Sequence, residues 1–176
     1  MSPMPTKSDF LLDPNIVFLN HGSFGACPRP VFEAYQQFQR RLELQPVRFF
    51  RDITELDRAA RQALGAFLNT DANNLVFVTN VTFGVNIITH SLALKPGDEV
   101  LTTDHEYGAC NTAWEYYCEK VTGAIYRKQH IALPVSSAEE ILEQFWQGVN
   151  ERTKVIYISH ITSPTALRMP VEAICA

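Results

Sequence analysis

Hydrophobic positions in the first part of the chain follow a helical pattern. Apolar side chains at helical spacing predict a helix over residues 31–44, which Pro46 ends. A second apolar stripe predicts a helix that runs to about Leu68, and Asp52 with Glu55 resembles a capping box at its start. We therefore expect the chain to be helical between residues 31 and 68.

Beyond residue 74, short apolar runs alternate with helical patterns. The apolar runs predict strands over residues 75–78, 99–103, 124–128 and 154–159. The helical patterns cover residues 82–94, residues 109–121, and a segment from the cap residues Ser137 and Glu140 to Trp146. Strands that alternate with helices of this length predict an α/β fold with a mainly parallel sheet and helical crossovers.

The last residues, 171–176, have the pattern of the first turns of an apolar helix. Such a helix is stable only when it packs against another layer of structure. We therefore expect the sequence to be incomplete and the sheet to belong to a larger domain.

Composition and charge exclude several function classes. Hydrophobic residues make up 46% and charged residues 19% of the chain, as in ordinary globular proteins. A formal net charge of −4 gives no general attraction to nucleic acid. Neither a signal peptide nor a membrane span is predicted, and the four cysteines form no C-x-x-C pair. Free thiols in a cytoplasmic protein, with no nucleic-acid or membrane partner, are the expectation.

The turn over residues 79–84 connects a predicted strand to a predicted helix. Free N–H groups at the helix start and the Thr82 hydroxyl suit a phosphate group, and Gly84 allows close approach of the anion. A plain helix cap by Thr82 is the alternative interpretation.

Two further strand ends carry polar residues. After residue 103 come Asp104 and His105, which suit acid–base chemistry, and Tyr107, whose ring suits stacking on a planar cofactor. A solvated loop is the alternative. The hydroxyl groups of residues 160–165 suit hydrogen bonds to a ligand, or belong to an ordinary Ser-Pro turn. The histidines have no distinctive spacing, and no metal site is predicted.

Four segments together resemble the class-V aminotransferase family, which depends on pyridoxal 5′-phosphate (PLP) and has fold type I. The order and spacing are most similar to the isopenicillin-N-epimerase-like branch, kin to cysteine desulfurases. The segments are residues 19–25 with Pro28, 79–86, 104–114 and 159–165. The resemblance extends from about Val17 to the end of the chain and corresponds to the first half or less of such an enzyme.

The resemblance implies roles for single residues. Asn80, Val81 and Thr82 correspond to the phosphate-binding turn of PLP, and Tyr107 to the residue stacked on its pyridine ring. Ser163 takes the position of an asparagine near the phenolic oxygen in cysteine desulfurases. The substrate entrance corresponds to Asn20 and His21. Residues 1–30 are then an N-terminal arm and entrance loop, and residues 31–176 the N-terminal portion of the PLP-binding large domain.

The groups that perform the family's covalent chemistry are not in these 176 residues. The resemblance places the aspartate that pairs with the pyridine nitrogen, and the Schiff-base lysine, beyond the helix that begins at Val171. None of the five lysines present lies in a matching motif; they are Lys7, Lys95, Lys120, Lys128 and Lys154. We therefore predict no catalytic residue and no turnover for these residues alone.

The complete enzyme is expected to be a homodimer that acts on an amino acid or aminoacyl compound. Epimerisation, transamination, elimination and desulfuration all remain open. Two alternatives to this function are a catalytically empty fragment that acts as an interaction module, and an α/β domain that binds a phosphate or nucleotide at Thr82.

Overall fold

The computed structural model describes residues 6–176, which divide into two compact units between Val76 and Phe77. Of the predicted N-terminal arm over residues 1–30, the first five residues lie outside the described part.

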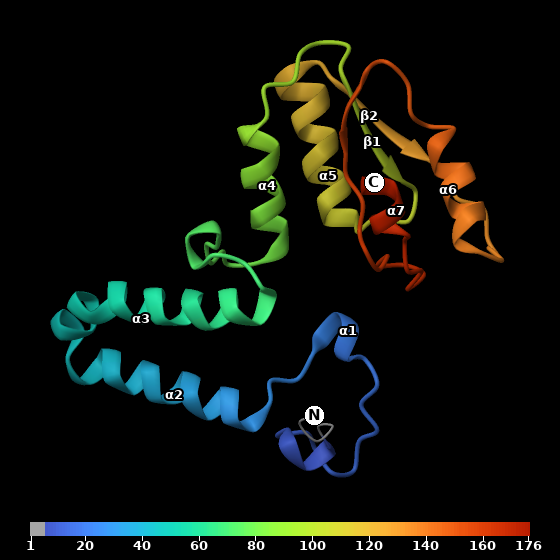
Figure 1. Ribbon diagram of the computed structural model, residues 1–176. Coiled ribbons are helices and arrows are strands. Elements are labelled where there is room, and N and C mark those ends of the chain that lie inside the picture. The colour runs from blue at the N-terminus through green and yellow to red at the C-terminus, as the bar shows by residue number, and fades with distance from the viewer. Residues whose placement is uncertain (1–5) are drawn as a thin grey trace. The chain divides into compact units, whose positions relative to one another are not determined.

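The first unit is helical (Figure 1). Its main element is the pair of consecutive helices α2 (Arg29–Leu44) and α3 (Pro46–Leu68), which pack against each other. The helix predicted over residues 31–44 is thus confirmed by α2. The shorter elements of this unit are η1 (Lys7–Asp9), α1 (His21–Phe24) and η2 (Ala72–Asn74).

The predicted start of the second helix was wrong. α3 begins at Pro46, six residues earlier in the chain than Asp52. Proline suits the first helical turn because that position needs no N–H donor. Asp52 is an interior residue of α3, and its carboxylate pairs with Arg41 of α2 at 2.6 Å instead of capping a helix. None of the helices described between residues 6 and 176 has the length and apolar character needed to cross a membrane.

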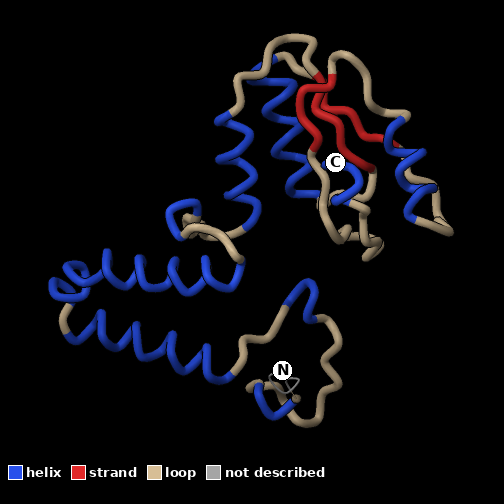
Figure 2. The backbone as a smooth tube through the Cα atoms, in the orientation of Figure 1, coloured by secondary structure: helices blue, strands red, loops and turns tan. Residues whose placement is uncertain are grey.

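The second unit is an α/β structure. Its three-stranded sheet consists of β1 (Glu99–Thr103), β2 (Ile125–Gln129) and β3 (Thr153–Ile156), all parallel, in the order β2–β1–β3 (Figure 2). The helices of this unit are α4 (Val81–Ser91), α5 (Gly108–Tyr116) with the π-helical turn η3 (Tyr117–Thr122), α6 (Ala138–Trp146) and α7 (Val171–Cys175). The predicted parallel sheet with helical crossovers is confirmed.

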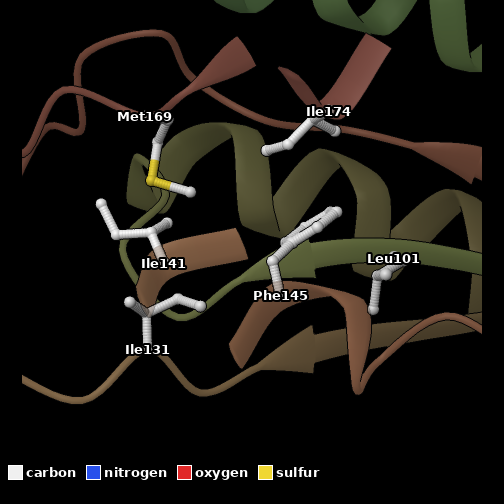
Figure 3. Close-up of a cluster of buried hydrophobic side chains, with 6 residues drawn as sticks. All are labelled: Leu101, Ile131, Ile141, Phe145, Met169 and Ile174. Carbon is white, nitrogen blue, oxygen red and sulfur yellow. The ribbon is translucent and has the colours of Figure 1, made fainter. Parts of the chain in front are cut away.

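Alternating side chains of β1 form two separate cores, because successive residues of a strand point to opposite faces. Val100 packs with α5 and η3 around the buried side chains of Trp114, Tyr117 and Cys118. Burial raises the pKa of the Cys118 thiol to about 11, so this sulfur packs as a neutral group. The opposite core consists of Leu101, Ile131, Ile141, Phe145, Met169 and Ile174. Figure 3 shows these six side chains gathered around Phe145.

Two predicted strands differ from the structure. Residues 75–78 are not a strand, and Val76 is 80% exposed. An apolar run becomes a strand only when a neighbour accepts its backbone hydrogen bonds, and no strand of the described chain pairs with it. The last predicted strand ends at Ile156 rather than at residue 159, because the chain then turns toward a short bridge between Ile161 and Arg168.

Gly148 makes room for two side chains of the sheet. A Cβ atom at this position would lie 2.8 Å from Leu101 Cδ1 and 2.9 Å from Gln129 Oε1. We expect Gly148→Ala to lower the free energy of unfolding by about 1–3 kcal/mol through overpacking. Chemical denaturation followed by circular dichroism measures this loss. Gly108→Ala is the control, since a Cβ there meets nothing within 4 Å; equal losses in both variants would contradict the steric explanation.

Candidate functional site

The carboxyl ends of β1 and β3 form a topological switch point. After β1 the chain enters α5, which covers the face of Val100, whereas after β3 it reaches α7, whose Ile174 packs on the opposite face. Ligands of α/β proteins bind beyond the strand ends at points where the loops leave neighbouring parallel strands in opposite directions.

The N-terminus of α4 lies at the same end of the second unit. α4 and α5 pack side by side, and both begin at the end of the sheet toward which β1 and β2 run (Figure 1). The Asn80 side chain caps α4 by accepting a hydrogen bond from Phe83 N–H at 2.8 Å. The N–H groups of Val81 and Thr82, as first residues of the helix, have no intrahelical partner. Together with the half-buried Thr82 hydroxyl they form a donor set for an anion.

Tyr107 and Ser163 lie in the segments that follow β1 and β3 respectively. Tyr107 occupies the cap position before α5, and 52% of its surface is exposed. Ser163 lies exposed in the turn between β3 and α7. An exposed ring and an exposed hydroxyl at the ends of neighbouring strands provide one stacking surface and one hydrogen-bonding group for a planar polar ligand.

Glu106 joins the two loops. Glu106 is only 5% exposed, although it lies in the loop three residues after the end of β1. The carboxylate accepts hydrogen bonds from both polar groups of Ser159, the backbone N–H at 2.9 Å and the hydroxyl at 2.5 Å. The residue before Tyr107 therefore fixes the start of the segment that carries Ser163.

His105 joins the same loops at a second point. Its Nε2 lies 2.8 Å from the carbonyl oxygen of Ile131, and its Nδ1 lies 2.9 Å from the Thr165 hydroxyl. Because a carbonyl only accepts, Nε2 donates its hydrogen to Ile131, and in the neutral ring Nδ1 then accepts from the Thr165 hydroxyl. The Thr165 hydroxyl also lies 2.8 Å from that of Thr162, which accepts a hydrogen bond from Leu167 N–H. With both nitrogens used, the His105 ring serves as a structural link.

Asp104 is held by groups from the end of β2. Partial burial raises the pKa of its carboxyl, but hydrogen bonds from His130 Nδ1 at 2.5 Å and Ile131 N–H at 3.0 Å outweigh that effect and lower the pKa below its ordinary value. In the described part of the chain, no group of three or more His, Cys, Asp or Glu side chains is arranged to hold a metal ion.

Four of the five lysines bond or pair with groups other than the residues proposed for the site. Lys7 donates to the carbonyl oxygens of Pro14 and Ile16, and Lys128 pairs with Glu115 at 2.6 Å. Lys154 donates to a backbone carbonyl, Lys120 lies 3.9 Å from Glu119, and Lys95 begins the turn before β1.

Asn20 and His21 belong to the first unit, which is described by itself. The His21 ring makes an edge contact with Phe18, at 4.8 Å between centroids, and lies 5.3 Å from Phe10. With those two rings it lines a hollow of about 330 Å³. A role of both residues in a substrate entrance remains a prediction.

Sequence reasoning gave no role to Glu106 or Ser159, and it considered Thr165 only as a group that could bond to a ligand. Their partners are 53 and 60 positions apart in the chain, so no local pattern links them. The one available signal is that two consecutive strand ends of a parallel sheet both carry polar residues, which the topology brings to one edge.

Known protein families and relatives match this chain over most of its length. The family model described as "Aminotransferase class-V" matches residues 17–176. Isopenicillin N epimerase of Streptomyces clavuligerus is 33% identical over 170 residues, which are 96% of this chain and 42% of that protein. A probable chloroplastic L-cysteine desulfhydrase of Arabidopsis thaliana is 27% identical over 91% of this chain and 37% of its own length.

Solved structures show the same architecture. A mutant of the protein C-DES, with glycine covalently linked to its PLP cofactor, matches with a TM-score of 0.84 and 26% identity, over 98% of this chain and 46% of that one. The apo cysteine desulfurase of Thermococcus onnurineus NA1 matches in fold, with a TM-score of 0.75 and 18% identity, over 98% of this chain and 44% of that one. The chain thus spans less than half the length of these relatives.

Proposed function

Because the chain belongs to the class-V aminotransferase family, we propose that its second unit forms the phosphate- and ring-contacting part of a PLP site. The observation that carries this proposal is the donor set at the start of α4, at the same end of the unit as the exposed Tyr107 ring. Neither the interaction module nor the nucleotide-binding domain is favoured by the comparisons.

The residues present fit PLP by their chemistry. A phosphate needs several donors and a positive electrostatic environment, and the N–H groups of Val81 and Thr82, the Thr82 hydroxyl and the helix dipole supply both. A pyridine ring needs an aromatic partner and a polar contact at its edge, for which Tyr107 and Ser163 are available. When bound, PLP supplies an electron sink for carbanion chemistry at an amino acid.

We propose further that the complete enzyme acts on an amino acid or aminoacyl compound, as the names of its relatives suggest, and works as a homodimer. Asn20 and His21 would line its substrate entrance, with residues 1–30 as the arm and residues 31–176 as part of the large domain. Four free thiols support a reducing compartment such as the cytoplasm; they are Cys27, Cys110, Cys118 and Cys175.

Substitution of Thr82 tests the proposed contact with the phosphate group. We expect the 176-residue chain to bind both PLP and inorganic phosphate weakly, and Thr82→Val to weaken both by about tenfold, because a half-buried hydroxyl donor to an anion is lost. Fluorescence titration with each ligand measures this change. Thr112→Val on α5 is the matched control, since its hydroxyl bonds only to Gly108 O and its loss should leave both affinities unchanged.

A different pattern of ligands would contradict the proposal. Thermal stabilisation by a nucleotide that PLP and phosphate do not reproduce would favour a nucleotide-binding domain instead. Unchanged affinity for both ligands in Thr82→Val would remove Thr82 from the site.

A further inference from the structure

The segment after β3 is fastened to the end of β1 at two points on either side of Ser163. Ser159 bonds to Glu106, and Thr165 bonds to His105. Since His105 and Glu106 directly precede Tyr107, one dipeptide holds the loop that carries the exposed serine and also the residue that carries the exposed ring. We call His105 and Glu106, with Ser159 and Thr165, the loop clamp.

Glu106 is a buried carboxylate that does not take part in an ion pair within the described residues. None of the ion pairs found among residues 6–176 includes it, although its side chain is almost fully buried. Burial of a carboxylate is costly unless hydrogen bonds compensate it. Both of its oxygens receive such bonds from the single residue Ser159, which fixes direction as well as distance.

His105 adds a second constraint that a single contact cannot provide. One contact would let the loop rotate about Ser159. The second contact at Thr165, continued through Thr162 to the N–H of Leu167, removes that freedom. The His105 ring also bonds to Ile131, which follows β2. Segments that follow all three strands of the sheet are therefore linked to the loop.

We propose that His105 and Glu106 are positioning residues, which hold Ser163 and Tyr107 at a fixed separation so that one planar ligand contacts both. This inference rests on the proposed function, in which that ligand is PLP. Preorganisation of this kind raises affinity because the loop loses little freedom on binding. The ring contacts depend on the clamp, whereas the phosphate contacts at the start of α4 do not.

The test compares two ligands on the full chain. Glu106→Ala removes both bonds to Ser159, and we expect it to weaken PLP binding by about tenfold while leaving the affinity for inorganic phosphate unchanged. Glu106→Gln should restore wild-type affinity, because its carbonyl oxygen accepts from Ser159 N–H and its amide donates to the Ser159 hydroxyl. Glu119→Ala, on an exposed glutamate of η3, is the matched control and should change neither affinity.

Milder variants cover the case in which Glu106→Ala does not fold. Ser159→Ala and Thr165→Val each remove one hydroxyl from the clamp. We expect each to weaken PLP binding by about threefold, again without an effect on phosphate. The proposal would be overturned if the variants lost affinity for both ligands to the same extent, or if they lost affinity for neither ligand. So would a Glu106→Gln variant as weak as Glu106→Ala, because charge rather than position would then matter.

Hydrogen exchange separates this proposal from the proposed function. Without any ligand, the amide protons of Ser159 and Leu167 should exchange slowly in the wild type and faster in Glu106→Ala and Thr165→Val respectively. If the wild type bound no PLP but these amides lost protection in the variants, the PLP site would be refuted and the clamp geometry retained. Unchanged exchange in both variants would refute the clamp itself.

Discussion

Phe145→Ala lowers the free energy of unfolding by about 3–5 kcal/mol, the largest effect that we expect from a single substitution in this chain. Phe145 is 0% exposed and lies at the centre of the core between α6 and the sheet (Figure 3). Its ring fills space between Leu101 and Ile174, which α6 and α7 cannot close without moving. A loss of this size is a large share of the stability of an ordinary domain.

Trp146→Ala provides the matched control for this prediction. Trp146 is the next residue of α6 and also aromatic, but it is 43% exposed. Its removal should cost at most about 1.5 kcal/mol, from the loss of its edge contact with Phe145. Urea denaturation followed by circular dichroism compares the two variants. Equal losses would show that the core is not organised around Phe145.

Glu99→Gln should lower the free energy of unfolding by about 2 kcal/mol near neutral pH. Only 1% of the Glu99 side chain is exposed, and Glu99 is the first residue of β1. Its carboxylate accepts a hydrogen bond from Asn150 at 2.8 Å and pairs with Arg152 at 2.5 Å and Arg127 at 3.5 Å. The three partners come from the segments around β2 and β3, so one charge ties the three strands together.

The pH dependence gives this second prediction a distinct signature. The hydrogen bond from Asn150 and the charges of both arginines outweigh burial and hold the pKa of Glu99 below its ordinary value of 4.5. A lowered pKa means that the carboxylate stabilises the fold fully above pH 4.5 and loses this effect as the pH falls through the folded-state pKa. The difference between the wild type and Glu99→Gln should therefore shrink below pH 4.5.

Glu119→Gln is the matched control, because Glu119 and Lys120 are both exposed and 3.9 Å apart. Exposed pairs contribute at most about 1 kcal/mol. Chemical denaturation at several pH values measures the free energy of unfolding of the wild type and of both variants. A difference between Glu99→Gln and the wild type that stays constant with pH would contradict the electrostatic explanation.

The parts of the fold that depend on local pattern were predictable from the sequence. The cap formed by Ser137 on Glu140 N–H and the buried strand β1 are examples, since the same few residues that form them also reveal them. The start of α3 was misread because Asp52 and Glu55 have capping-box spacing inside a helix as well as at its start. Residues 75–78 have the composition of a strand, but pairing is a property of two segments and not of one.

The candidate site likewise has a part that could be predicted from the sequence and a part that could not. Asn80 and Thr82 could be proposed from the sequence because the start of a helix has a local pattern, and Tyr107 because it lies shortly after the predicted strand β1. The clamp was not recognisable, because polar residues at a strand end are equally consistent with a solvated loop. Only the three-dimensional contacts show that His105 and Glu106 are buried against residues that follow β3. Which residues contact a cofactor remains a prediction from the family resemblance.

The order β2–β1–β3 also determines when this sheet can be completed during synthesis. β1 pairs on one side with residues 125–129 but on the other with residues 153–156, which leave the ribosome much later. Contacts between distant segments form slowly because the loop between them must close first. A nascent chain that has released β1 and β2 therefore presents one unpaired edge of β1, the middle strand of the three, until β3 emerges. An unpaired strand edge is a template for pairing with another chain, so we expect this interval to favour aggregation.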